Sequence, residues 1–92
     1  ITCFVRIRLS IHTEDTIQKF EKIVNDTPEI LDCYLMAGGP DYQLRVVTGS
    51  LDEYEELVRK TFQKLPGIAS VETSFAYGVV KKSRVLPVKI GA

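Results

Sequence analysis

The chain has 92 residues, a length that suits one domain with one modest core. Hydrophobic residues make up 45% of it and charged residues 26%, so intrinsic disorder and collagen-like repeats are excluded. Lysine and arginine together number 12, as do aspartate and glutamate, which leaves no excess of positive charge for binding nucleic-acid phosphates.

The first predicted element is a strand over residues 2–9, where side chains alternate between two faces. One face carries Cys3, Val5, Ile7 and Leu9, and the other carries Phe4, Arg6 and Arg8. Thr13 then predicts a helix N-cap, because its hydroxyl can accept a backbone N–H. The helix continues with apolar residues at helical spacing and ends within residues 25–28; the apolar positions are Ile17, Phe20, Ile23 and Val24.

Two more alternating runs predict a hairpin. The first covers residues 30–37, with Leu31, Cys33 and Leu35 on one face and Asp32, Tyr34 and Met36 on the other. Gly38, Gly39 and Pro40 predict the turn. The second run covers residues 41–48, with Tyr42, Leu44 and Val46 facing one way and Gln43, Arg45 and Val47 the other.

A second helix is predicted to follow, because Ser50 and Glu53 have the spacing of a capping box. Its apolar face is formed by Leu51, Tyr54, Leu57, Val58, Phe62 and Leu65. Pro66 and Gly67 predict its end. A fourth strand is expected over residues 69–80, and residues 85–88 could add a short edge strand.

The predicted order, βαββαβ, is that of an α+β ferredoxin-like fold. Right-handed crossovers place both helices on one face of a four-stranded antiparallel sheet. The opposite face would combine apolar residues with charges of both signs; the apolar ones are Phe4, Tyr34, Met36, Val47 and Ala76. We expect a homodimer through this face, because exposed apolar patches usually mark interfaces. A half-solvated face is the alternative.

No apolar run is long enough to cross a bilayer, and no signal peptide is visible, so a cytoplasmic location without membrane contact is expected. Cys3 and Cys33 are predicted to be buried reduced thiols. The chain begins at Ile1, without an initiator Met and already inside a strand pattern, which suggests a piece of a longer protein.

Residues capable of catalysis or metal binding are few, and no cofactor or metal is expected. His12 is the one histidine, and the cysteines lack metal-site spacing. Asp41 differs from the helix carboxylates because it follows two glycines. Glycine N–H groups could bind a carboxylate and Asp41 an ammonium, as a free amino acid would require. An aspartate that only closes the turn is the alternative.

Several motifs of the chain match one family at its usual spacing. They are Asp32-Cys33-Tyr34, the hairpin from Gly38 to Tyr42, Leu65-Pro66-Gly67-Ile68, Thr73-Ser74 and Val80-Lys81. With them the sequence resembles the C-terminal effector domain, of RAM type, of the Lrp/AsnC (feast/famine) transcriptional regulators. The resemblance covers nearly the whole chain. It departs from the family at Gly39, where many members carry a polar or acidic residue, and at Pro40, which removes a backbone donor.

The resemblance implies a regulatory domain rather than an enzyme, one that dimerises through its sheets and assembles further, often to a tetramer of dimers. It implies that an amino acid or related small molecule binds near the hairpin, between dimers. The matching positions are Leu35, Gly38, Gly39 and Asp41, with Thr73, Ser74, Phe75 and Ala76 from the fourth strand. The family binds DNA through a helix-turn-helix that this chain does not contain.

Two alternatives remain at this stage. One is a small dimeric ferredoxin-like enzyme of the monooxygenase type, which would need polar residues between sheet and helices. The other is a stand-alone amino-acid-binding regulatory module.

Overall fold

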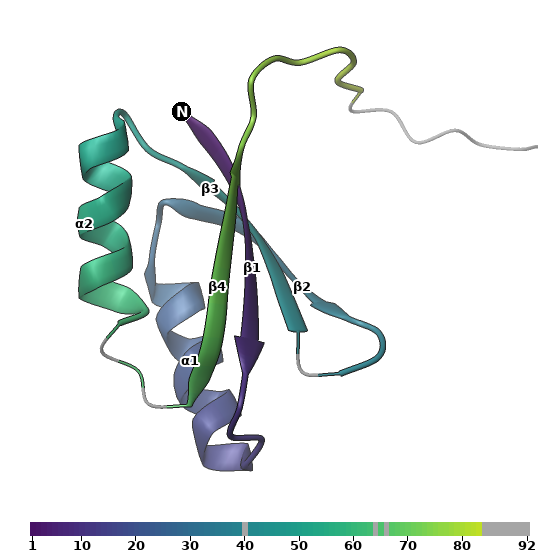
Figure 1. Ribbon diagram of the computed structural model, residues 1–92, viewed down its shortest axis with the longest axis vertical. Helices are drawn as coiled ribbons and strands as arrows, with labels where there is room; N and C mark the ends of the chain where they lie inside the picture. The colour runs from purple at the N-terminus through teal and green to yellow at the C-terminus, as the bar shows by residue number, and fades with distance from the viewer. Residues whose placement is uncertain (40, 64, 66, 84–92) are drawn as a thin grey trace, which may run out of the picture.

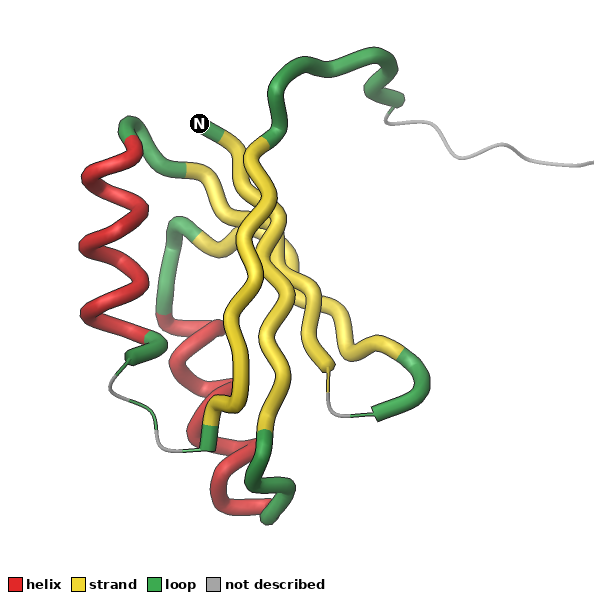
Figure 2. Tube along the Cα trace, in the orientation of Figure 1, coloured by secondary structure: helices red, strands yellow, loops and turns green. Residues whose placement is uncertain are grey.

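The computed structural model of the chain describes residues 1–39, 41–63, 65 and 67–83 (Figure 1). Its elements are β1 (Thr2–Leu9), α1 (Glu14–Asp26), β2 (Ile30–Met36), β3 (Asp41–Val47), α2 (Leu51–Thr61) and β4 (Ile68–Phe75). The four strands form one sheet in the order β2-β3-β1-β4, with every neighbouring pair antiparallel. Both helices cover the same face (Figures 1 and 2). The predicted ferredoxin-like fold is confirmed.

The helices begin where their capping residues predict. The Thr13 side chain accepts a hydrogen bond from the Thr16 backbone N–H, and Ser50 accepts one from Glu53. Glu53 also reaches back toward the helix start, but its Oε2 accepts the N–H of Gly49 at 2.8 Å, one residue before the Ser50 N-cap, rather than that of Ser50 as in the predicted capping box. The α2 helix ends at Thr61, so Leu65 lies beyond it, although Leu65 still packs against the core.

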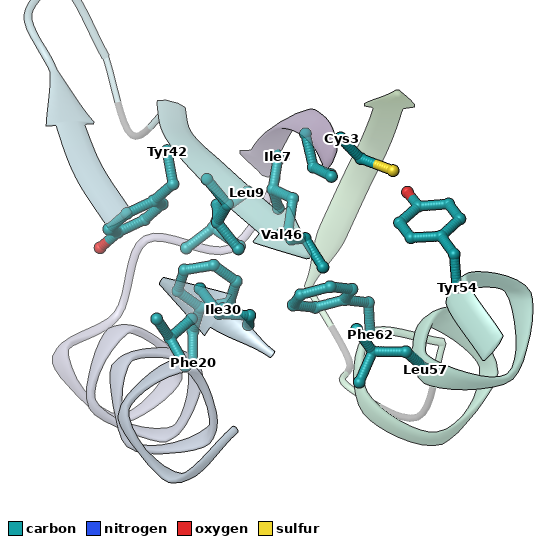
Figure 3. Close-up of a cluster of buried hydrophobic side chains, with 13 residues drawn as sticks. Cys3, Ile7, Leu9, Phe20, Ile30, Tyr42, Val46, Tyr54, Leu57 and Phe62 are labelled. Carbon is teal, nitrogen blue, oxygen red and sulfur yellow. The ribbon is translucent and has the colours of Figure 1, made fainter. Parts of the chain in front are cut away.

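The core lies between the sheet and the two helices (Figure 3). Phe20 of α1 packs against Tyr42 of β3, with ring centroids 4.5 Å apart, and against Phe62 beyond α2 at 6.3 Å. The inward positions of β1 are almost completely buried: Cys3, Val5, Ile7 and Leu9 are at most 2% exposed. Burying each such aliphatic side chain contributes about 1.5–3 kcal/mol, so β1 is the centre of the core.

A bulge in β2 changes which residues face the helices. Ile30 pairs with Val46, whereas Asp32 pairs with Arg45, so Leu31 has no partner on β3. Ile30 is therefore 9% exposed and Leu31 is 51% exposed. The prediction that Leu31 faces the core was wrong. An extra residue in a strand moves the side chains that precede it to the opposite face of the sheet. The alternation of apolar residues in the sequence does not reveal where such an extra residue lies.

The fourth strand is shorter than predicted. It ends at Phe75 rather than near residue 80, and the Ala76 N–H makes a further bond to the Thr2 carbonyl at 2.9 Å. Because β1 begins at Thr2, no strand remains to pair with the described residues after Ala76. Tyr77 and Val80 are fully exposed in consequence. The predicted edge strand over residues 85–88 lies outside the described residues.

Gly67, before β4, has a φ of +93° and close neighbours. A Cβ there would lie 3.1 Å from both the Ile11 Cβ and the Thr16 Cγ2. We predict that Gly67→Ala destabilises the fold by about 1–3 kcal/mol, because an L side chain strains this backbone conformation. The melting temperature should fall by roughly 5 °C or more.

Gly78→Ala is the matched control for this substitution. A Cβ at Gly78 meets no heavy atom within 4 Å, and its backbone is not in the left-handed region. Its melting temperature should equal that of the wild type. Equal melting temperatures for both variants would contradict the proposed strain at Gly67.

Candidate functional site

The carboxylate of Asp41 lies between two arginines on the sheet face away from the helices. Its Oδ1 accepts a hydrogen bond from the Arg8 Nε at 3.1 Å, and its Oδ2 accepts one from the Arg6 Nη2 at 3.0 Å. Arg8 lies directly opposite Asp41 across the β1–β3 pairing, and Arg6 approaches diagonally. Asp41 is only 9% exposed. The side chains of Arg6 and Arg8 both cover it.

The two arginines stabilise the charged form of this carboxyl group. The hydrogen bond from Arg8, followed by that from Arg6, holds the pKa of Asp41 below its usual value, although partial burial acts in the opposite direction. Asp41 is thus an ionised carboxylate whose two oxygens both accept hydrogen bonds. Each oxygen keeps a further lone pair, but the side chain is only 12% exposed, so a ligand ammonium would have to approach past the two guanidinium groups.

The β2–β3 turn projects away from the two helices (Figure 1). Gly38 has a φ of +99°, a conformation that glycine adopts without strain, and nothing lies within 4 Å of where its Cβ would be. Two apolar side chains flank the turn on opposite faces of the sheet. Met36, which pairs with Asp41, is 41% exposed on the outer face, and Leu35, which pairs with Tyr42, is 66% exposed on the helix side. Open backbone, exposed apolar surface and charged groups therefore meet at this end of the sheet.

The predicted site residues of the fourth strand point to both faces. Thr73 and Phe75 lie opposite Val5 and Cys3, on the helix side. The Thr73 hydroxyl bonds to that of Tyr54 on α2, and the Phe75 ring stands edge-on to Tyr54 at a centroid distance of 5.7 Å. Ser74 lies opposite Phe4 and faces the other way, as Ala76 also should by strand alternation.

The hairpin group and the β4 group do not meet within one chain. Asp41 lies at the Arg8 end of β1, whereas Thr73 to Phe75 pair with Val5 to Cys3 near its start. Moreover, β2 and β4 are the two opposite edges of the sheet. Leu35, Gly38, Gly39 and Asp41 flank one turn, but Leu35, which pairs with Tyr42, lies on the helix side of the sheet and Asp41 on the outer face. All four are separated from residues 73–76.

Sequence reasoning missed Arg6 and Arg8 as part of this site. Their spacing placed both side chains on the outer face of the first strand. It did not show which residue of the third strand lies opposite, because that depends on the register between two strands far apart in the chain.

Few other side chains that could bind a metal or take part in catalysis occur in the part of the chain that the structure describes. No three His, Cys, Asp or Glu side chains gather there as a metal ion would require. His12 Nε2 lies 2.8 Å from the Leu9 carbonyl oxygen, a local contact before α1. Cys3 and Cys33 are free thiols, and burial raises the pKa of each. Among the described residues, no helix is long and apolar enough to cross a membrane.

A four-stranded antiparallel sheet with two helices on one face is the ferredoxin-like architecture, which hosts many functions, so the class of protein has to come from comparison with relatives. The family described as the Lrp/AsnC ligand-binding domain matches residues 2–86 of the chain. The chain belongs to this family. It is a ligand-binding domain of the kind found in transcriptional regulators, and it is not an enzyme.

Individual relatives agree with this assignment. The chain is 36% identical over 85 residues to an HTH-type transcriptional regulator, y4sM, of Sinorhizobium fredii; the match covers 92% of the chain and 67% of that protein. It is also 36% identical over 87 residues to the glutamate uptake regulatory protein of Zymomonas mobilis, covering 95% of the chain and 52% of that protein. The chain thus spans between half and two thirds of the length of these relatives.

Solved structures show the same fold. An AsnC family transcriptional regulator from Agrobacterium tumefaciens superposes with a TM-score of 0.81 at 32% identity, over 94% of this chain and 56% of that one. The regulator NMB0573 of Neisseria meningitidis, solved as a complex with L-Met, gives 0.84 at 24% identity, over 94% and 55%. At that identity the second match bears on the fold alone.

The pairing of Asp41 predicts a dependence of stability on pH. Because its pKa is lower in the folded chain than in the unfolded chain, its contribution is complete at neutral pH. That contribution disappears as the pH falls below about 4, where the unfolded chain takes up the proton first. The melting temperature of the wild type should therefore exceed that of Asp41→Asn at pH 7, and the gap should close in acid.

Removing Arg8 tests whether its pairing with Asp41 causes this pH dependence. In a chain that already carries Arg8→Gln, adding Asp41→Asn should lower the melting temperature at pH 7 by less than it does in the wild type. The hydrogen bond from Arg8, the main cause of the lowered pKa of Asp41, is absent there. A gap between the wild type and Asp41→Asn that stays constant from pH 7 into acid would contradict the electrostatic explanation.

Proposed function

We propose that this chain senses an amino acid or a closely related small molecule and couples its binding to self-assembly, within a transcriptional regulator of the Lrp/AsnC family. The observation that carries the proposal is the solvent-open glycine turn between β2 and β3, with exposed apolar side chains and a charged cluster beside it. One relative supports the ligand class by its name, the glutamate uptake regulatory protein of Zymomonas mobilis.

The effector site is proposed to form between copies of the chain. One copy would contribute Leu35, Gly38, Gly39 and Asp41 at the hairpin, and a neighbouring copy would contribute Thr73, Ser74, Phe75 and Ala76. The separation of these two groups within one protomer supports this arrangement, because a single chain cannot place both around one small molecule. Effector binding would then depend on assembly, and assembly on the effector.

The outer face of the sheet is proposed as the dimer interface. Four large apolar side chains are between 37% and 61% exposed there: Phe4, Tyr34, Met36 and Val47. The charged side chains on this face balance in sign, with Arg6, Arg8 and Arg45 against Asp32, Asp41 and Glu72. A balanced face can meet its own copy across a twofold axis without net repulsion.

Further assembly into a tetramer of dimers is proposed by analogy with the family. So are DNA binding through a helix-turn-helix outside this sequence and a cytoplasmic location.

The ligand proposal predicts thermal stabilisation. We expect at least one of the standard amino acids to raise the melting temperature of the 92-residue chain, because a ligand that binds only the folded state shifts the unfolding equilibrium. At a hundredfold excess over its Kd the gain is about 2.7 kcal/mol, or roughly 10 °C or more for a domain of this size. The absence of any shift at millimolar concentrations would exclude amino-acid sensing by this chain.

The dimer proposal predicts the effect of charge on the outer face. Sedimentation at micromolar concentration should show at least a dimer for the wild type. Phe4→Glu and Tyr34→Glu should shift the chain toward monomer, because each buries a carboxylate in the interface. Leu51→Glu is the control: Leu51 is 47% exposed, but it begins α2 on the helix side of the sheet. A monomeric wild type would overturn the proposal.

A further inference from the structure

A cleft lies on the helix side of the sheet, between α1 and the edge strand β2. Its volume is about 310 Å³, at the lower end of the range typical of small-molecule sites. The side chains that line it are Glu21, Val24, Asn25, Cys33, Leu35 and Tyr42. The proposed dimer would cover the outer face of the sheet, so it leaves this cleft open. Leu35, one of the positions matching the family's effector site, belongs to this cleft and not to the surroundings of Asp41.

The polar wall of the cleft is formed by a hydrogen-bonded pair. The Tyr42 side chain is part of the core and only 3% exposed, and its hydroxyl lies at the outer side of the core cluster (Figure 3). This hydroxyl donates to Glu21 Oε2 at 2.9 Å. Burial, followed by the hydrogen bond to Glu21, raises the pKa of Tyr42 to about 12, so the hydroxyl remains a donor at neutral pH. The bond holds the Glu21 carboxylate against the sheet, at the cleft.

Glu21 has no cationic partner among the described residues, unlike two other carboxylates of α1. Asp15 pairs with Lys19 and Asp26 pairs with Lys22, so both lysines of the helix are engaged. In the same part of the chain only the Oε2 of Glu21 accepts a hydrogen bond. The Oε1 atom and the negative charge are therefore available to a ligand.

The remaining side chains of the cleft supply a second acceptor and an apolar surface. The Asn25 Nδ2 donates to the Glu21 carbonyl oxygen at 2.9 Å, which leaves the Asn25 Oδ1 as an acceptor. Val24, Cys33 and Leu35 are apolar, and Leu35 is 66% exposed. No positively charged side chain lines the cleft. These groups suit a ligand that has an ammonium group and an apolar body, because an ammonium needs acceptors and negative charge.

We propose that Glu21 holds the amino group of the effector, in the cleft between α1 and β2, and that Asp41 does not. This inference rests on the proposed function and specifies its ligand class: amino acids with an apolar side chain, for which the ammonium is indispensable. An acid of the same shape that lacks the ammonium should bind weakly.

The first test changes only the ligand. Thermal-shift and calorimetric titrations of the 92-residue chain with the standard amino acids would identify the one that binds most tightly. That amino acid would then be compared with its 2-hydroxy acid, in which a neutral hydroxyl replaces the ammonium. For methionine the probe is L-2-hydroxy-4-(methylthio)butanoate. We expect the 2-hydroxy acid to bind at least about tenfold more weakly, because it cannot form the charge-assisted hydrogen bond to Glu21.

The thiol of Cys33 reports whether the ligand occupies this cleft. Cys33 is half-buried and lines the cleft, whereas Cys3 is completely buried in the core. Alkylation with iodoacetamide, followed by mass spectrometry, measures each thiol separately. A saturating amino acid should slow the alkylation of Cys33, because access to the thiol is blocked. Cys3 is the internal control, since its alkylation reports unfolding of the core. An unchanged rate at Cys33 with the ligand bound would overturn the inference.

The second test changes the protein. Glu21→Gln removes the negative charge but keeps an amide oxygen that can accept the Tyr42 hydroxyl, so the melting temperature should change little. The affinity for the amino acid should fall about tenfold or more. Glu14→Gln is the matched control: it removes the same charge from the same helix, but Glu14 bonds to Gln18 and does not line the cleft. Its affinity should stay within about threefold of the wild type.

The outcomes separate this inference from the proposed function. A 2-hydroxy acid that binds as tightly as the amino acid, or full affinity in Glu21→Gln, would overturn recognition by Glu21 and leave amino-acid sensing intact. Lost binding in Asp41→Asn together with full binding in Glu21→Gln would assign the ammonium to Asp41 instead. If no amino acid binds, both proposals fail. The ligand comparison and the thiol assay need no variant, so they decide the question even if a substitution impairs folding.

Discussion

The antiparallel pairing of β1 with β3 on one side and β4 on the other is the constraint on which the rest of the molecule depends. It alternates the residues of β1 between an almost completely buried face and a charged face. The buried face gives both helices their packing surface, which a domain of 92 residues could hardly replace elsewhere. The same register places Arg8 opposite Asp41, so one geometric relation sets both the core and the charged cluster.

The pairing of strands gives Asp41 different hydrogen-bond partners from those that its place after a glycine turn suggests. An aspartate after a glycine turn usually serves the turn itself, by accepting local backbone N–H groups. Here its oxygens instead accept bonds from another strand, which covers the carboxylate and keeps it ionised. The cluster therefore links the hairpin to the central strand. Whatever binds at the hairpin acts on side chains that also belong to the proposed dimer face.

The proposed dependence of this domain on other copies comes from the two edges of the sheet. Because β2 and β4 are both outer strands, the residues matching the family's effector site lie at opposite margins and opposite ends of the sheet. Assembly is a physical means of uniting them. The proposed regulation follows from that separation: a ligand held between copies stabilises the assembled state in proportion to its preference for it.

The sequence by itself determined the order of elements, the caps of both helices and the buried face of β1, because these depend on local chemistry and on a period of two or 3.6 residues. Family motifs also located the hairpin. Tertiary structure alone decided the bulge that exposes Leu31, the end of β4 at Phe75 and the burial of Asp41 by two arginines. Each of these depends on which residues of distant strands lie opposite one another. Register is a property of the paired strands, and neither strand carries it alone.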